Sequence, residues 1–177
     1  MKKTAWDNEK ICNHILNTNF PPLGESDHFD ALNRCVEKLK SYVSSVVDVG
    51  CCKAEFSDCF PGIEYCGADM PHIIEKVSRK LRPRNKYIQL NASLDSLAVL
   101  SNFDLIVMNS FLSEMPSPLK TLHSVLTYAK KYIIIHRQDI VDGETDLENY
   151  KTYGGLPTVN SLINIEDFNN IATLNNC

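Results

Sequence analysis

The segment from Val46 to Asp69 constrains the fold of this chain more than any other part of the sequence. It contains an apolar strand that ends in Asp48-Val49-Gly50-Cys51, a short helix, a Pro-Gly turn and a second strand that ends in Asp69. The two acids are 21 residues apart, close to the length of one strand–helix–strand unit. Such a unit brings backbone amides and a carboxylate to the carboxyl ends of neighbouring parallel strands, where open α/β sheets bind nucleotides. The segment therefore predicts a nucleoside-binding α/β domain, with Asp69 placed to accept hydrogen bonds from ribose hydroxyls.

Short apolar strands alternate with helical segments along the rest of the chain. Five segments rich in β-branched residues predict strands: Ser45–Val49, Ile63–Asp69, Lys86–Leu90, Phe103–Met108 and Lys131–Ile135. Helices are predicted over residues 26–43, 71–81, 119–128 and 166–174, from apolar spacings of three and four. This order predicts a mostly parallel sheet between two helical layers, a three-layer α/β/α sandwich. Residues 138–160 are predicted to form a loop, because Asp142-Gly143 and Gly154-Gly155 are turn signals.

Charge and composition narrow the range of partners. The net charge of −4 argues against a general nucleic-acid binder, which would carry a basic excess. Six cations fall within residues 76–86 and could hold an anionic partner, although a solvated helix end is the more common reading of such a run. The seven cysteines show no C-x-x-C pair and no zinc-finger spacing, so we expect reduced thiols and no metal site.

No segment of the sequence resembles a membrane or export signal. The N-terminal residues lack the apolar region of a signal peptide, and no apolar run approaches the ~18 residues that a membrane span needs. We therefore expect a cytoplasmic protein with no membrane partner.

Two kinds of nucleotide site begin with such a strand–helix–strand unit. Dinucleotide dehydrogenases need G-x-G-x-x-G, because the pyrophosphate lies against bare backbone at a helix N-terminus. The three positions here are Gly50, Cys52 and Glu55, and a glutamate at the helix start would repel pyrophosphate. The dehydrogenase interpretation is therefore disfavoured, and an oxidoreductase with a different nucleotide is a weaker alternative.

Over residues 44–175 the chain resembles the class I S-adenosylmethionine (SAM)-dependent methyltransferases. The resemblance rests on five motifs in the family's order: Asp48-Val49-Gly50-Cys51, Tyr65-Cys66-Gly67-Ala68-Asp69, residues 103–109 (FDLIVMN), residues 131–136 (KYIIIH) and residues 165–168 (IEDF). It implies a helical N-terminal cap at residues 1–43, whose first 25 residues fold over the site, and a Rossmann-like methyltransferase domain at residues 44–177. The two would form one compact unit.

The resemblance also implies a cofactor pocket. Asp48 and Gly50 would frame the loop at the methionine end of SAM, with Cys51 and Cys52 in the same loop. Asp69 would bind the ribose, with Met70 beside it, and Asn91 and Ala92 would border the adenine. Asn109 would face the sulfonium and the acceptor.

The chain departs from the family pattern in two places. Cys52 and Ala54 occupy loop positions where the family has glycine, and a Cβ there can cost about 1 kcal/mol or more. The sequence also ends where the family's last two strands would begin, which would leave the fifth strand as an exposed edge. We expect the N-terminal segment, residues 156–163 or a second subunit in a homodimer to cover that edge.

Several residues are candidates for chemistry with an acceptor. His136 at the end of the fifth strand could act as a base, with Arg137 as an anion clamp, or could only cap a loop. Glu114 could face the acceptor, or could only favour the N-terminus of the next helix. Tyr150 and Tyr153 beside Gly154-Gly155 could form a lid, or an ordinary surface turn.

These inferences lead to two hypotheses about function. The first is a SAM-dependent methyltransferase acting on a small-molecule acceptor, such as a sugar or an acidic metabolite. The alternative is a catalytically inactive methyltransferase-like binding or assembly protein, in which Cys52 fills the cofactor pocket. An open pocket between Gly50, Asp69 and Asn109 would favour the enzyme.

Overall fold

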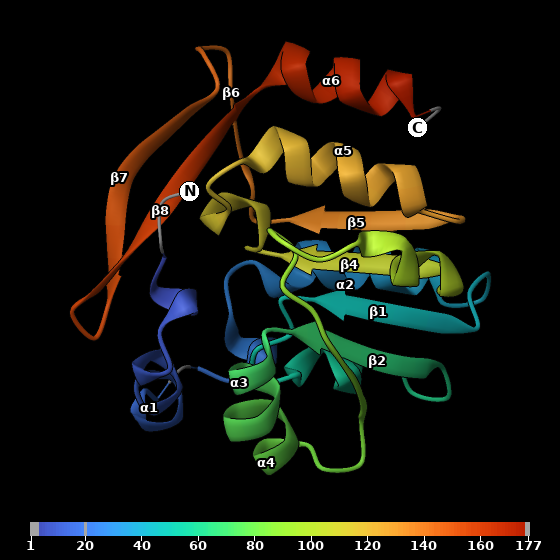
Figure 1. Cartoon of the computed structure of the whole chain (residues 1–177). Helices are drawn as coiled ribbons and strands as arrows, with labels where there is room; N and C mark the ends of the chain where they lie inside the picture. Colours follow the sequence, from blue (N-terminus) through green and yellow to red (C-terminus); the bar gives the residue numbers. More distant parts are fainter. Residues whose placement is uncertain (1–3, 20, 176–177) are drawn as a thin grey trace.

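A five-stranded parallel sheet forms the centre of the molecule (Figure 1). The computed structural model describes residues 4–19 and 21–175, with residues 148–153 described by their backbone alone. The strand order is β3-β2-β1-β4-β5. The strands are β1 (Ser45–Val49), β2 (Glu64–Asp69), β3 (Lys86–Gln89), β4 (Leu105–Asn109) and β5 (Tyr132–His136). The order reverses between β1 and β4, and α/β sheets bind ligands beyond the carboxyl ends of the strands at such a point.

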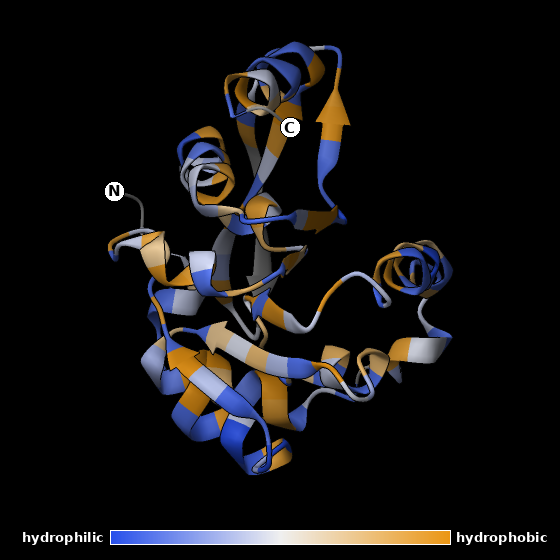
Figure 2. Ribbon diagram, turned by 90° about the vertical axis from the view of Figure 1, so that its right-hand side faces the viewer, coloured by the Kyte–Doolittle hydropathy of each residue, from blue (hydrophilic) through white to orange (hydrophobic). Residues whose placement is uncertain are grey.

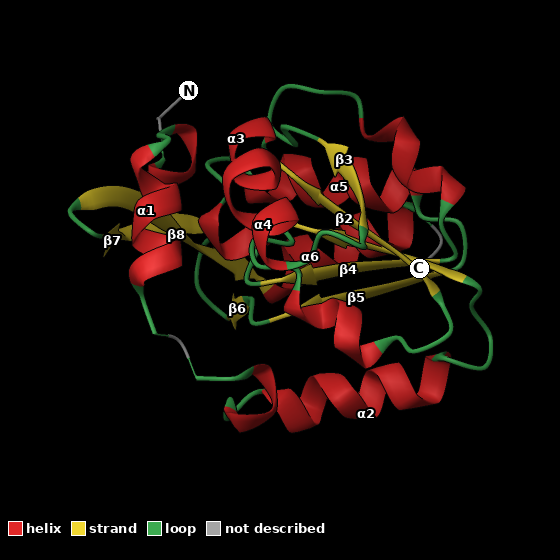
Figure 3. Cartoon of the chain, turned by 90° about the horizontal axis from the view of Figure 1, so that it is seen from below, coloured by secondary structure: helices red, strands yellow, loops and turns green. Residues whose placement is uncertain are grey.

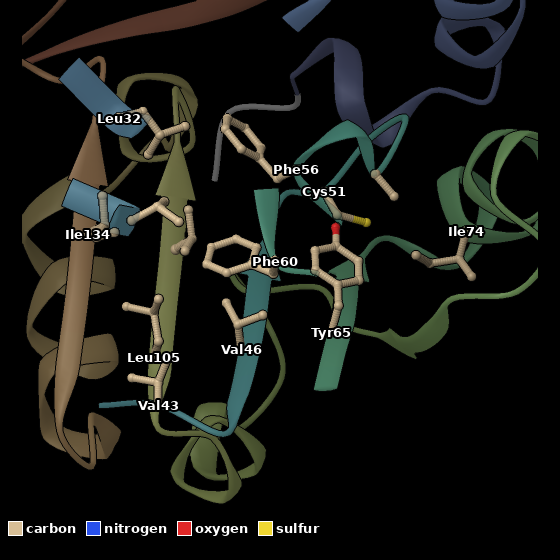
Figure 4. Packing of buried hydrophobic residues seen from close by; sticks show 13 residues of the cluster. Leu32, Val43, Val46, Cys51, Phe56, Phe60, Tyr65, Ile74, Leu105 and Ile134 are labelled. Atoms are coloured by element: carbon tan, nitrogen blue, oxygen red, sulfur yellow. The ribbon is translucent and has the colours of Figure 1, made fainter. Parts of the chain in front are cut away.

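The two faces of the sheet are buried by different helices, because neighbouring strand residues point to opposite sides. Leu105 and Val107 of β4 belong to one hydrophobic cluster, and Ile106 and Met108 belong to the other. The first cluster includes residues of α2 (Phe29–Leu39) and of the 3₁₀ helix η3 (Glu55–Cys59) (Figure 4). The second includes residues of η5 (Leu97–Asn102), α5 (Pro118–Tyr128) and α6 (Ile165–Leu174). The predicted three-layer sandwich is confirmed.

The helices are amphipathic, as their spacing predicts. In Figure 2 hydrophobic and hydrophilic residues alternate along the helical ribbons. In α2 the fully buried residues are Leu32 and Val36, which lie four positions apart on one face. This one-sided burial ties α2 to the sheet and leaves its charged face in solvent.

A continuous helical segment follows β2. It consists of α3 (Pro71–Ile73), a π-helical turn η4 (Ile74–Ser78) and α4 (Arg79–Leu81). Pro71 occupies the first turn, where its missing N–H costs nothing. Ile73 and Val77 pack against η1 (Ala5–Asp7) and α1 (Lys10–Asn17), which places the N-terminal segment beside Cys52 in the loop after β1. The division into a cap and a domain at residue 43 stays a prediction.

The loop predicted over residues 138–160 is wrong. This region forms most of a second sheet, in the order β6-β8-β7, from β6 (Asp139–Val141), β7 (Asp146–Tyr153) and β8 (Leu156–Asn164). Gly154 and Gly155 connect β7 to β8 with positive φ at both residues, as two-residue hairpin turns require. The glycine pair is thus a hairpin signal rather than a loop signal. The hairpin turn lies against His14 of α1, and α1 runs beside β7 and β8 (Figure 3).

The central sheet ends at β5 in the part of the chain that the structure describes. Residues 156–163 pair with β6 and β7 rather than with β5, so the expectation that they cover this edge is wrong. The N-terminal segment packs on η4 instead. A homodimer through the β5 edge stays a prediction. The remaining short helices, η2 (Leu23–Glu25) and η6 (Leu112–Glu114), precede α2 and α5.

Candidate functional site

A cavity of about 500 Å³ opens at the carboxyl ends of β1, β2 and β4. Its walls come from the loops after β1, β2, β3 and β4, from η6, from Arg137 after β5 and from the N-terminal residues Thr4, Trp6 and Ile15. Most of the site residues that the sequence predicts line it: Gly50, Cys51, Cys52, Asp69, Met70, Asn91, Ala92, Asn109 and Glu114. Asp48 and His136 do not. The fold therefore gathers residues from four separate loops into one ligand-sized space.

The loop after β1 has an unusual backbone. Gly50 has φ 77°, and the two residues that replace family glycines, Cys52 and Ala54, have φ 47° and 56°. The backbone thus keeps the left-handed conformation that favours glycine. At Gly50 itself an added Cβ would lie 2.6 Å from the ring of Phe111, so this position requires glycine on two grounds.

Asp69 faces this loop from the end of β2. Its carboxylate accepts hydrogen bonds from the backbone N–H groups of Cys52 at 2.9 Å and Met70 at 2.7 Å. Burial raises the pKa of Asp69 to about 6, against the lowering effect of these two donors. A carboxylate has about four acceptor sites, and these two donors occupy two of them.

Asp48 points away from the cavity into the core. It is 1% exposed and accepts a hydrogen bond of 2.7 Å from the hydroxyl of Tyr65. Burial raises the pKa of Asp48 to about 7. In Figure 4 the Tyr65 hydroxyl points toward Cys51, at the base of the cofactor loop. Direct contact of Asp48 with a cofactor stays a prediction; in this structure its carboxylate binds the Tyr65 hydroxyl and does not line the cavity. The sequence analysis missed Tyr65, although a tyrosine in a buried strand requires a partner for its hydroxyl.

Asn109 and His136 form a pair at the ends of β4 and β5. The two residues are direct partners in the strand register, and His136 Nδ1 lies 2.8 Å from Asn109 Oδ1. Because an amide oxygen only accepts hydrogen bonds, Nδ1 of His136 is the donor. Burial, Arg137 and His28 lower the pKa of His136, while a backbone hydrogen bond with His28 raises it less. A role for His136 as a base stays a prediction; in this structure its ring orients Asn109 and does not line the cavity.

Glu114 reaches the cavity from η6. The residue is 4% exposed, and its carboxylate accepts a hydrogen bond from the indole N–H of Trp6. This contact joins residues 108 positions apart and fixes η1 over the site. No sequence motif indicates Trp6, because the one tryptophan of the chain lies among polar residues without apolar periodicity.

Backbone strain concentrates around the cavity. The non-glycine residues with positive φ among those described are Cys52, Ala54, Ser110 and Arg137, and each follows the end of β1, β4 or β5. Such conformations cost about 1–3 kcal/mol each and persist at functional sites where the surroundings fix them. The distribution of strain thus marks the same rim as the cavity.

The cations of residues 76–86 are mostly engaged. Four of them form ion pairs: Lys76 with Glu9, Arg79 with Glu75, Arg82 with Asp58 and Lys86 with Glu64. These pairs are largely exposed, which favours the interpretation as a solvated helix end. The side chains of Tyr150 and Tyr153 lie outside the described residues.

The described residues form neither a membrane-spanning helix nor a cluster of metal ligands. No helix within residues 4–19 and 21–175 is long and apolar enough to span a membrane. No group of three or more metal-ligating side chains occurs among the same residues.

Comparison with known proteins identifies the fold. No protein-family model and no curated protein matches the sequence. Among solved structures, the N-terminal domain of EvdMO1 with S-adenosylhomocysteine (SAH) and D-fucose is 12% identical, with a TM-score of 0.64 over 94% of this chain and 84% of that chain. The sugar N-methyltransferase KedS8 from Streptoalloteichus sp. ATCC 53650 is 12% identical, with a TM-score of 0.61 over 100% of this chain and 87% of that chain.

A third similar structure agrees. SAM-bound CalS10, an amino pentose methyltransferase from Micromonospora echinaspora, is 12% identical, with a TM-score of 0.59 over 90% of this chain and 89% of that chain. The chain therefore has the class I methyltransferase fold, as the sequence motifs predict.

Proposed function

We propose that the chain is a SAM-dependent methyltransferase that acts on a small-molecule acceptor, such as a sugar or an acidic metabolite. The observation that carries this proposal is the open cavity bordered by Gly50, Asp69 and Asn109. It lies at the topological switch point of a methyltransferase fold, where this class of sheet binds its ligand. The similar structures solved with SAM or SAH support the same cofactor.

The residues around the cavity fit a nucleoside without a pyrophosphate. Asp69 offers acceptors to two ribose hydroxyls. Asn91 and Ala92 line the same cavity and would border the adenine attached to that ribose. Glu55 lines the same cavity and would repel a pyrophosphate, which supports SAM over a dinucleotide. When bound, SAM supplies an activated methyl group on a sulfonium.

The acceptor would enter beside the N-terminal segment. Trp6, Glu114 and Arg137 line the cavity, so an acceptor bound in it would meet one aromatic face, one carboxylate and one guanidinium. Methyl transfer is an in-line displacement that depends mainly on positioning and on removal of a proton from the acceptor. Glu114 is the candidate base that borders the cavity, and His136 would act through Asn109.

The alternative of an inactive scaffold predicts that Cys52 closes the cavity. Cys52 instead stands in the cavity wall and packs toward the cluster formed by η1, α1, Ile73 and Val77. Its Cβ is thus accommodated on the side of the N-terminal segment, and nothing in the site favours loss of cofactor binding.

Calorimetric titration of the purified chain with SAM and SAH tests the proposal. We expect binding in the micromolar range, weakened at least tenfold by Asp69→Asn, which keeps the size of the side chain and removes its charge. Asp139→Asn changes an exposed acid of β6 and should bind as the wild type does. A folded wild-type chain that binds neither ligand would refute the proposal. Incubation with SAM and panels of sugars and carboxylic acids, followed by mass spectrometry, would then identify the acceptor.

A further inference from the structure

We propose that Ser78 is a positioning residue of the cofactor loop: its hydroxyl holds Cys52 in the left-handed conformation that cofactor binding needs. The inference rests on the proposed function, because the loop is the part of the site assigned to SAM. It adds a residue that no sequence motif and no cavity wall indicates.

The contact between Ser78 and Cys52 is short and buried. Ser78 is 0% exposed, and its Oγ lies 2.6 Å from the backbone oxygen of Cys52. Oγ also lies 3.4 Å from the backbone oxygen of Ile73. A hydroxyl has one proton to donate, and the shorter contact, to Cys52, takes it. The thiol of Cys51 lies 3.9 Å from the same Oγ, so both cysteines of the loop meet one serine.

Ser78 is itself held in place. It is the last residue of the π-helical turn η4, and such turns are frequent at functional sites. Its backbone oxygen accepts a hydrogen bond of 2.8 Å from the N–H of Arg82, and the Tyr87 hydroxyl of β3, which donates to the Arg82 carbonyl at 2.8 Å, lies 3.1 Å from it. Ile74 and Val77, on the same turn, are fully buried. The serine is therefore a fixed support rather than a mobile side chain.

Two hydrogen bonds flank the strained φ torsion of Cys52. Its N–H donates to Asp69 at 2.9 Å, its carbonyl oxygen accepts from Ser78 at 2.6 Å, and its φ is 47°. A non-glycine residue disfavours this conformation by about 1–2 kcal/mol, and the two hydrogen bonds on either side of the torsion oppose its release. Loss of the Ser78 hydroxyl would let the Cys52 peptide rotate, and the contact between the loop and Asp69 would be lost with it.

Two substitutions and their combination test this mechanism by SAH titration. We expect Ser78→Ala to weaken SAH binding about fivefold to thirtyfold. Without the hydroxyl, a loop conformation with negative φ at Cys52, which does not bind SAH, is favoured by about that factor. In a Cys52→Gly background the same change should alter binding less than about twofold, because glycine adopts positive φ without support. Ser44→Ala is the control: the hydroxyl of Ser44 donates to the Asp104 carboxylate at 2.7 Å, before the first residues of β1 and β4 and so at the opposite end of the sheet from the cavity.

Thermal unfolding of the same proteins separates loop conformation from stability. Ser78→Ala should lower the melting temperature in both backgrounds but weaken binding only when residue 52 is cysteine. If Ser78→Ala does not fold, Ser78→Cys keeps the volume with a weaker donor and should show the same pattern to a smaller extent. Equal SAH affinity of wild type and a folded Ser78 variant overturns the inference, as does an equal loss in both backgrounds. A wild-type chain that binds no SAH overturns the proposed function as well.

Discussion

Replacing Asp48 by asparagine should flatten the pH dependence of folding stability. Asp48 is almost completely buried, and Tyr65 donates a hydrogen bond of 2.7 Å to its carboxylate. Burial raises the pKa of Asp48 from 3.8 to about 7. Between these two values the folded chain retains a proton that the unfolded chain has released.

The sign and size of the effect follow from this difference. Because the folded state binds more protons between about pH 4 and pH 7, the free energy of unfolding falls as the pH rises. One such group contributes a slope of about 1.4 kcal/mol per pH unit, and a pKa change from 3.8 to about 7 corresponds to about 4 kcal/mol in total. Asparagine cannot ionise, so the variant lacks this contribution. The buried amide donors that asparagine introduces cost about 1–3 kcal/mol when they lack partners. Above pH 7 the variant should therefore have a free energy of unfolding about 1–3 kcal/mol higher than that of the wild type.

Urea unfolding of wild type and Asp48→Asn across this pH range gives the two slopes directly. Asp69, whose pKa of about 6 acts in the same direction, is present in both proteins and largely cancels from the comparison. Asp139→Asn, at an exposed acid of β6, is the control and should follow the wild-type profile. Parallel pH profiles for wild type and Asp48→Asn would refute the reasoning, because Asp48 would then not hold a proton in the folded state.

Three further results are expected. Tyr65→Phe should lower the free energy of unfolding by about 2 kcal/mol at about pH 8 but only about 1 kcal/mol at about pH 5, because the lost hydrogen bond is stronger when Asp48 is ionised. Urea unfolding at both pH values measures this difference, and equal losses would contradict it. Gly50→Ala should abolish SAH binding and lower the free energy of unfolding by about 1–3 kcal/mol, because Gly50 has φ 77° and an added Cβ would contact Phe111. Calorimetry and urea unfolding check the two effects, and unchanged affinity would show that the loop tolerates a Cβ. Trp6 is the sole tryptophan and lines the cavity, so SAH should protect its fluorescence from acrylamide quenching; unaltered quenching by a chain that binds SAH would place the ligand away from Trp6.

The sequence alone predicted the central sheet closely. The five predicted strands agree with the observed ones to within two residues at each end, because runs of β-branched residues between turn signals are local features. The loop after β1 was marked by its motif, but whether Cys52 and Ala54 would keep a left-handed backbone was left open; both do, with positive φ like Gly50. Local chemistry sufficed for these elements, since each depends on residues near it in the chain.

Tertiary structure decided what depends on distant partners. The pair Gly154-Gly155 predicted a turn, but only the pairing of β8 with β6 and β7 made the surrounding residues a sheet. The contacts of Trp6 with Glu114, of Ser78 with Cys52 and of His136 with Asn109 join residues between 26 and 108 positions apart. No local pattern encodes such pairs, because each is set by how whole elements pack. The sequence therefore determined the frame and the loop of the site, and packing decided which side chains support and enclose it.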